Sequence, residues 1–264
     1  MILGLTSSTI ILIYGAAAIL PGVFLLLYIY KLDTVEKEPP SLIWKLLLGG
    51  LGAAVCALIL EEIFNTVSSK FVQQSNADDT LIQAVVDALF VAVIEESSKF
   101  VFLKKISWKH PAFNCRFDGM VYAISVSLGF AILENVLYVF FYGGLSVALS
   151  RALLSIPAHM CFGAYMGIYY GRAKVCQHAD DASGTEWNLV AALLTAMVFH
   201  MIYDATLMVN TGFSIALFAL VVLFMTTVET SLKRSSSGMI QTASCHLRQN
   251  RISHIPILKQ VNRA

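Results

Sequence analysis

Seven long apolar runs constrain the fold of this chain more than any other feature. They lie at 6–30, 43–64, 81–103, 119–141, 146–171, 188–209 and 213–232. A helix needs about 20 residues to cross a bilayer. Backbone polar groups in lipid must be satisfied within the protein, and for runs this long only α-helices do so. The sequence therefore predicts an all-α, polytopic membrane bundle of seven transmembrane helices.

The charged fraction agrees with a membrane protein. Charged residues make up 13% of the chain and hydrophobic residues 57%, whereas a soluble domain carries about 25% charged residues. The five cysteines are odd in number and form no CxxC pair. This argues against a disulfide framework or a cysteine-rich zinc site.

The basic residues predict the orientation of the bundle. Cytoplasmic loops of membrane proteins are enriched in Lys and Arg. The loops on one side hold only Lys70 and Arg151. We therefore expect the N-terminus outside and the C-terminus in the cytoplasm of a multi-pass cell-membrane protein. The basic residues on the predicted cytoplasmic side, before the tail, are Lys31, Lys37, Lys45, Lys104, Lys105, Lys109, Arg116, Arg172 and Lys174.

The chain divides into one membrane domain and a tail. Residues 1–234 hold all seven runs, and the loops between them are too short for a separate domain. Residues 235–264 are first Ser-rich and then basic, so we expect a flexible cytoplasmic tail near anionic lipid. We expect the lipid bilayer as a partner and no nucleic acid.

Four acids and two histidines lie well inside four of the apolar runs. At bilayer depth each costs about 2.5–3.5 kcal/mol on insertion scales, so such residues usually face an internal, hydrated site. Several of them on four helices predict one shared polar cavity. These residues are Glu95, Glu96, Glu134, His159, His200 and Asp204.

The third run contains an acidic pair followed by a lysine. Residues three and four apart share a helix face, so Lys99 can reach both Glu95 and Glu96. The lysine charge would keep one carboxylate ionised, while two adjacent acids resist ionising together. This arrangement suits a general base. The alternative interpretation is a buried ion pair that joins helices.

The later runs supply histidines and further acids. Glu134 has no cationic neighbour within a turn, so its partner must come from another helix or a metal. His159 taken alone is more often a hydrogen-bonded core residue. His200 and Asp204 lie one turn apart and can orient an imidazole or supply two metal ligands. Together these groups are the inventory for activating water.

A second acidic pair has a simpler explanation. Glu61 and Glu62 lie at the outer end of the second run with no lysine following. We expect solvation at the membrane interface to satisfy both.

Small residues mark a packing face on the fifth run. Gly163, Gly167 and Gly171 recur at four-residue spacing, which lets another helix approach closely.

Taken in order, these motifs resemble the PrsW family of intramembrane proteases, which is related to the CAAX prenyl endopeptidases and bacteriocin-processing proteins. The resemblance runs from Asp33 to Asp204. Its motifs are the acidic-proline segment Asp33–Pro39, EExxK at Glu95–Lys99, the stretch Asp118–Asn135, His159 followed by Gly163 and Gly167, and HxxxD at His200–Asp204.

The resemblance implies cleavage of a membrane protein, for example a single-span anti-sigma factor. Glu95 matches the glutamate that acts as base toward water. Glu134 stands where the prenyl-protease branch has a histidine, which favours PrsW. His200 and Asp204 match positions proposed to bind metal or the oxyanion. Glu134, His159 and His200 would make zinc ligands, and a metal-free mechanism stays equally open.

Two other classes of function use similar residues. A proton-coupled transporter also carries intramembrane acids and histidines, although the halves show no inverted repeat and no paired broken helices. A non-catalytic membrane sensor or immunity-type binding protein would keep the bundle without needing Glu95 as a base.

Overall fold

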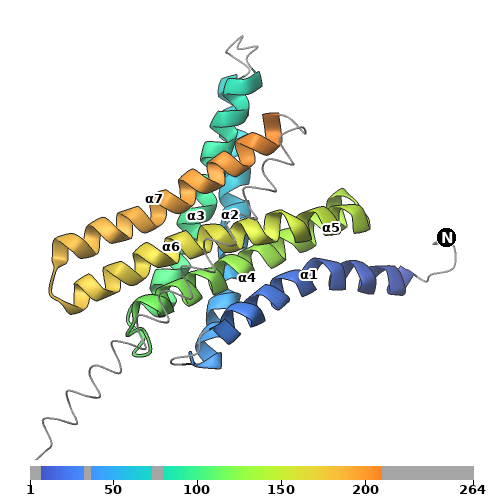
Figure 1. Cartoon of the computed structure of the whole chain (residues 1–264). Helices are drawn as coiled ribbons and strands as arrows, with labels where there is room; N and C mark the ends of the chain where they lie inside the picture. The colour runs from blue at the N-terminus through green and yellow to red at the C-terminus, as the bar shows by residue number, and fades with distance from the viewer. Residues whose placement is uncertain (1–6, 33–36, 73–79, 210–264) are drawn as a thin grey trace, which may run out of the picture.

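The computed structural model describes residues 7–32, 37–72 and 80–209, and within these residues every regular element is an α-helix. This agrees with the predicted all-α class. The helices are α1 Ser7–Leu32, α2 Pro40–Val72, α3 Thr80–Ser107, α4 Arg116–Tyr142, α5 Gly144–Leu153, α6 Ser155–His178 and α7 Ala182–Val209 (Figure 1). The seventh predicted run, 213–232, and the predicted tail, 235–264, lie outside the described residues.

Five segments of the described chain are long and apolar enough to cross a membrane. Helix α3 is not among them because it carries Glu95, Glu96 and Lys99 near its middle, together with charges elsewhere along it. The five segments are Ser7–Lys31, Pro40–Val67, Arg116–Tyr142, Gly144–His178 and Ala182–Leu207.

The fifth predicted run, 146–171, lies within the single candidate span Gly144–His178, which has a one-residue break between α5 and α6. Helix α5 ends and α6 begins around Leu154, which has φ −115° and ψ −62°. Pro157 follows in the first turn of α6. A proline lacks the N–H that would continue the hydrogen-bond ladder, and its ring clashes with the preceding turn, so it suits a first turn and not a helix interior. Helix α5 contacts α1 and α4, whereas α6 packs mainly against α4 and α7.

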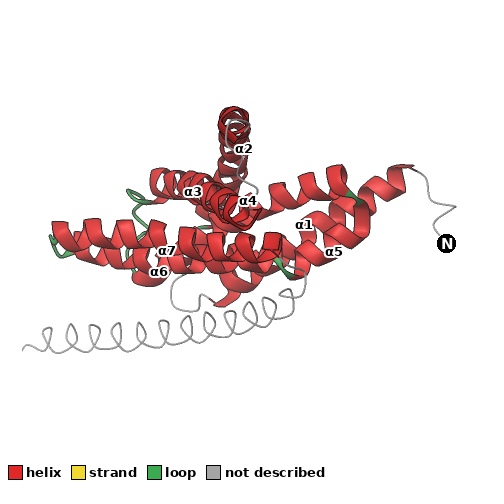
Figure 2. Ribbon diagram, turned by 90° about the horizontal axis from the view of Figure 1, so that it is seen from above, coloured by secondary structure: helices red, strands yellow, loops and turns green. Residues whose placement is uncertain are grey.

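Helix α4 is the central element of the bundle. Its residues are buried almost continuously from Phe117 to Ile132, whereas the exposed side chains of α1, α2 and α7 are largely apolar. Helices α6 and α7 run side by side, and α2 stands steeply to them (Figures 1 and 2). Because α4 packs against α1, α2, α3, α5 and α6, polar residues on separate runs can meet beside it.

The small-residue face of α6 packs against α4, as predicted. A Cβ on Gly167 would collide with the backbone of Met120, and a Cβ on Gly171 would collide with the backbone oxygen of Arg116. Glycine therefore lets the two backbones touch. This contact fixes the height of α6 against α4, and with it the position of His159 two turns earlier.

Candidate active site

Lys99 lies at the centre of a buried polar cluster. Its Nζ donates to Oε2 of Glu95 at 3.1 Å and to Oε1 of Glu96 at 2.7 Å, both one turn back on α3. The third donor points to Nδ1 of His159 on α6, 3.1 Å away. Nζ also lies 3.9 Å from the centre of the Phe130 ring on α4. The prediction that Lys99 reaches both acids is confirmed, and its three donors face three acceptors.

This contact fixes the tautomer of His159. An ammonium group can only donate, so Nδ1 accepts and the ring proton lies on Nε2. Nε2 is 2.8 Å from Oε2 of Glu134 on α4 and donates to it. Nη2 of Arg151 on α5 lies 2.9 Å from the same oxygen. The partners of Glu134 therefore come from other helices, as its isolation in the sequence indicated.

His200 on α7 is held between carboxylates. Its Nδ1 lies 2.8 Å from Oε1 of Glu96, and its Nε2 lies 3.2 Å from Oδ2 of Asp204. Nε2 is also 3.9 Å from Oε2 of Glu95. The Phe162 ring stacks on the imidazole with ring centres 4.8 Å apart and planes inclined by 18°. The stacking and the two carboxylates together fix both the position and the rotation of the ring.

The structure brings every residue of the predicted site into one connected cluster from four helices. The 3.9 Å approach of His200 to Glu95 joins α7 to α3, and the Lys99–His159 contact joins α3 to α6. The connected residues are Glu95, Glu96, Lys99, Glu134, His159, His200 and Asp204.

Part of this cluster has the donor set of a divalent metal site. Glu95, Glu96, His159 and His200 each offer one ligand atom, and these atoms lie within 4.8 Å of one another. Oε2 of Glu96 is buried and has no hydrogen-bond partner among the described residues, so it is free to meet a cation. The residues fit a metal in type and proximity. Glu134, which the sequence suggested as a ligand, is not one of these four.

Sequence reasoning missed Arg151. It was counted among the few basic residues outside the cytoplasm, yet its side chain is only 15% exposed and pairs with Glu134. Its guanidinium also lies 3.9 Å over the ring of Tyr138. The signal was present in the sequence, since Arg151 falls inside the apolar run 146–171 and an ionisable residue there needs a partner.

The interpretation of Glu61 was wrong. Glu62 is exposed, as expected of a solvated residue. Glu61 is half-buried and lines a cavity with Glu134, and its Oε1 is buried with no hydrogen-bond partner in the described chain. Interfacial solvation therefore does not account for it. Two adjacent glutamates point in different directions because successive helix positions lie on different faces.

Similarity to known proteins identifies the family. A family model described as PrsW family intramembrane metalloprotease matches residues 38–229, which is most of the chain. The chain belongs to the PrsW family.

Individual PrsW relatives match over most of their own length. Protease PrsW of Oceanobacillus iheyensis is 33% identical over 225 residues, covering 85% of this chain and 97% of the relative. Protease PrsW of Geobacillus kaustophilus is 31% identical over 207 residues, or 78% and 85% of the two chains. Protease PrsW of Bacillus subtilis is 31% identical over 189 residues, or 72% and 80%. No solved structure matches the chain.

Membership of the PrsW family makes this protein an intramembrane protease and a multi-pass membrane protein. This favours the protease hypothesis over the transporter and the non-catalytic binding protein. The matched region contains every residue of the polar cluster and the whole of α2 to α7.

We predict that Arg151→Met destabilises the protein by about 1–3 kcal/mol, because it leaves the partly buried carboxylate of Glu134 without its cation. The midpoint of thermal unfolding in detergent should fall by about 2–4 °C per kcal/mol. Arg172→Met is the matched control, since Arg172 is exposed on α6 and ion-paired to no carboxylate of the cluster. Equal midpoints for the two variants would contradict the structural role of Arg151.

Proposed function

We propose that this protein hydrolyses a peptide bond of a membrane-anchored protein, with Glu95 as the base that takes a proton from water. The observation that carries the proposal is the Lys99 contact. One ammonium group holds Glu95, Glu96 and His159 in fixed positions at the centre of the bundle. Fixed groups need little reorganisation during the reaction, which is the main source of electrostatic catalysis.

Exposure favours Glu95 over Glu96 as the base. The side chain of Glu95 is 7% exposed, whereas that of Glu96 is 0% exposed. Glu96 is also committed through one oxygen to both Lys99 and His200. A base must come within hydrogen-bond reach of the water that it activates. We therefore assign Glu95 to proton transfer and Glu96 to holding Lys99 and His200.

His200 is the residue best placed to stabilise the oxyanion of the tetrahedral intermediate. Its Nε2 lies between Asp204 and Glu95, on the side of the cluster where the base lies. An imidazole whose two nitrogens face carboxylates is held as a donor, and a donor aimed at developing negative charge lowers the barrier. Asp204 orients the ring. His159 and Glu134 connect Lys99 to Arg151 through hydrogen bonds and a final ion pair.

The metal ligands are assigned to Glu95, Glu96, His159 and His200 instead of the set that includes Glu134. When bound, a divalent metal such as zinc would supply Lewis acidity to the site. Lys99 contacts three of these four residues, so it and a metal would compete for the same carboxylates and imidazole. The protein residues position and activate water in either case.

The substrate that we propose is a protein with a single membrane span, of which an anti-sigma factor is an example. The cluster lies within the helical bundle, and a peptide bond in or near the bilayer is what such a site can reach. We further propose that residues 1–234 form the protease domain with seven spans, and that residues 235–264 form a cytoplasmic tail.

We predict that Glu95→Gln lowers the cleavage rate by about 10² or more, because the amide keeps the shape of the side chain and loses the basic oxygen. His200→Ala should be comparably damaging. The assay follows cleavage of a single-span substrate by purified protein in liposomes. Glu62→Gln is the matched control. Glu62 is exposed, so this variant should cleave the substrate at the wild-type rate.

A wild-type rate for Glu95→Gln would show that Glu95 is not the base. Glu96 would then be the next candidate, and the rate of Glu96→Gln would test it. Full activity in the double variant would contradict the proposed mechanism altogether. A chelator added to the same assay separates the two routes: loss of cleavage that zinc restores requires a metal, and unchanged cleavage means that the glutamate acts without one.

We predict from the basic loops that the N-terminus is outside the cell. A single cysteine at position 75 should react with an impermeant reagent in intact cells. A single cysteine at position 110 or the native Cys245 should react only after permeabilisation. The reverse labelling pattern would overturn the orientation.

A further inference from the structure

Helices α2 and α4 cross so closely that they must diverge on either side of the crossing. A Cβ on Gly50 would collide with the backbone oxygen of Val126, and a Cβ on Gly129 would collide with the backbone oxygen of Leu47. Two helices in backbone contact at one point separate as they continue at an angle, unless large side chains fill the gap. Ala54 and Ala57 follow on α2, and both are small.

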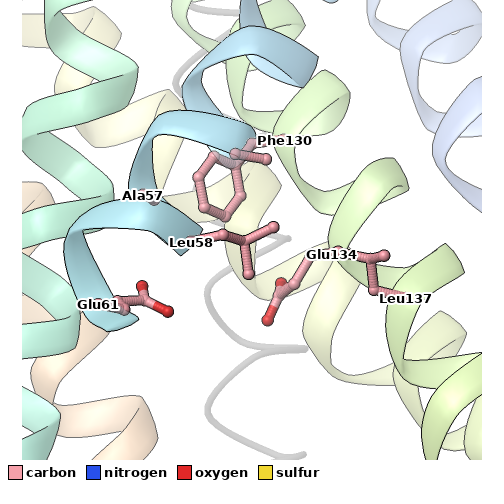
Figure 3. A pocket seen from close by; sticks show the side chains of 7 residues that line it. Ala57, Leu58, Glu61, Phe130, Glu134 and Leu137 are labelled. Atoms are coloured by element: carbon pink, nitrogen blue, oxygen red, sulfur yellow. The ribbon is translucent and has the colours of Figure 1, made fainter. Parts of the chain in front are cut away.

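A cavity lies where the two helices have separated. It is lined by Ala54, Ala57, Leu58, Glu61, Phe130, Glu134 and Leu137. Its volume of about 20 Å³ exceeds the roughly 10–15 Å³ that one water molecule needs. Figure 3 shows the carboxylates of Glu61 and Glu134 projecting from α2 and α4 into the same space.

The residues that line the cavity range from exposed to fully buried. Leu58 at its rim is 43% exposed, whereas Phe130 at its inner end is 2% exposed. The Phe130 ring lies beneath Lys99 and 5.6 Å from the ring of His159. Glu134, in the wall of the cavity, contacts His159 directly. At the inner end of the cavity, the Phe130 ring therefore lies between the cavity and the side chains of Lys99 and His159.

Glu61 places an unused acceptor in this cavity. Its Oε1 is buried and has no hydrogen-bond partner within the described residues. Leaving a buried acceptor unsatisfied costs about 1–3 kcal/mol, so the oxygen requires a donor that enters the cavity. Water offers two donors, one for Glu61 and one for Glu134 across the cavity. A substrate side chain would have to pass Leu58 and fit a space of about one water molecule.

We propose that the cavity between α2 and α4 is the route by which water reaches the buried site, and that Glu61 is the positioning residue that keeps the route hydrated. The proposal rests on the proposed function. Each turnover consumes one water: its OH joins the acyl carbon as the C–N bond breaks, and its remaining hydrogen ends on the amine. Glu95 and Glu96 are buried, so each new water must pass through the bundle to reach them.

The neighbours of Glu61 provide the comparison that tests this route. Leu60 and Glu62 adjoin it on α2 and lie at nearly the same depth, but both are exposed on the outer surface of the helix. Neither lines the cavity. A result that depends only on depth should therefore be the same at Leu60, Glu61 and Glu62. A result that depends on the cavity should appear only at Glu61.

The first test measures water in the route without using activity. Single cysteines replace Glu61 or Leu60 in a chain with its five native cysteines removed, and the protein in liposomes is treated with hydrogen peroxide, which is close to water in size and oxidises a hydrated thiolate to sulfenic acid. Leu58→Trp narrows the rim of the cavity, so it should slow the oxidation of Cys at 61 at least about tenfold and leave that of Cys at 60 unchanged. No change at 61, or the same change at both positions, would overturn the route. The same difference should appear in the Glu95→Gln protein, because this test does not depend on which residue is the base.

The second test measures turnover. Glu61→Leu should lower kcat about tenfold or more with KM unchanged, because an apolar side chain removes the water and touches no substrate. Glu62→Leu should leave both constants unchanged. Glu61→Gln should recover most of the lost kcat, since an amide still binds water. A wild-type kcat for Glu61→Leu would contradict the role of Glu61, and a rise in KM alone would make it a substrate-binding residue instead.

Discussion

The buried ammonium group of Lys99 is the interaction on which the rest of this structure depends. An ionised lysine with 1% of its side chain exposed is unfavourable unless its charge and all its donors are satisfied. Here two carboxylates of α3 balance the charge, and the imidazole of His159 takes the third donor. Helix α3 is too polar to face lipid along this side, so it must be covered by α2, α4 and α7.

A second ion pair extends the same network. Glu134 accepts from His159 and pairs with Arg151, so the network continues from α3 through α6 and α4 to α5. Both histidines consequently have fixed positions before a substrate arrives. In a low-dielectric bundle such a network stabilises the fold only while every member is present. Stability and catalysis therefore rest on the same side chains, and replacing one of them affects both.

The sequence was sufficient for the class of fold and for the members of the cluster. Apolar runs of membrane-spanning length predict helices, and the need to satisfy Glu95, Lys99 and His200 away from water predicts that they meet. The small-residue face of α6 that contains Gly167 could also be predicted, because the spacing of its glycines is that of a helix face.

Other features depended on tertiary geometry that the pattern does not encode. The one-residue break at Leu154 required knowing that Pro157 would interrupt the helix there. Glu61 looked like an interfacial residue because the pattern of α2 does not reveal where α4 lies. Its partner in the cavity, Glu134, is 73 positions away along the chain, and only the crossing angle of α2 and α4 brings them together.

A double-mutant cycle on the free energy of unfolding measures whether Lys99 and the carboxylates of α3 act as one unit. Lys99→Met alone leaves buried acids without their cation and should destabilise the protein by about 3–5 kcal/mol. Adding Glu96→Gln removes one of those acids. The double variant should therefore lose less stability than the sum of the two single losses, by about 1–3 kcal/mol. Losses that add to within about 0.5 kcal/mol would show that Lys99 and Glu96 are independent and that Lys99 does not organise the cluster.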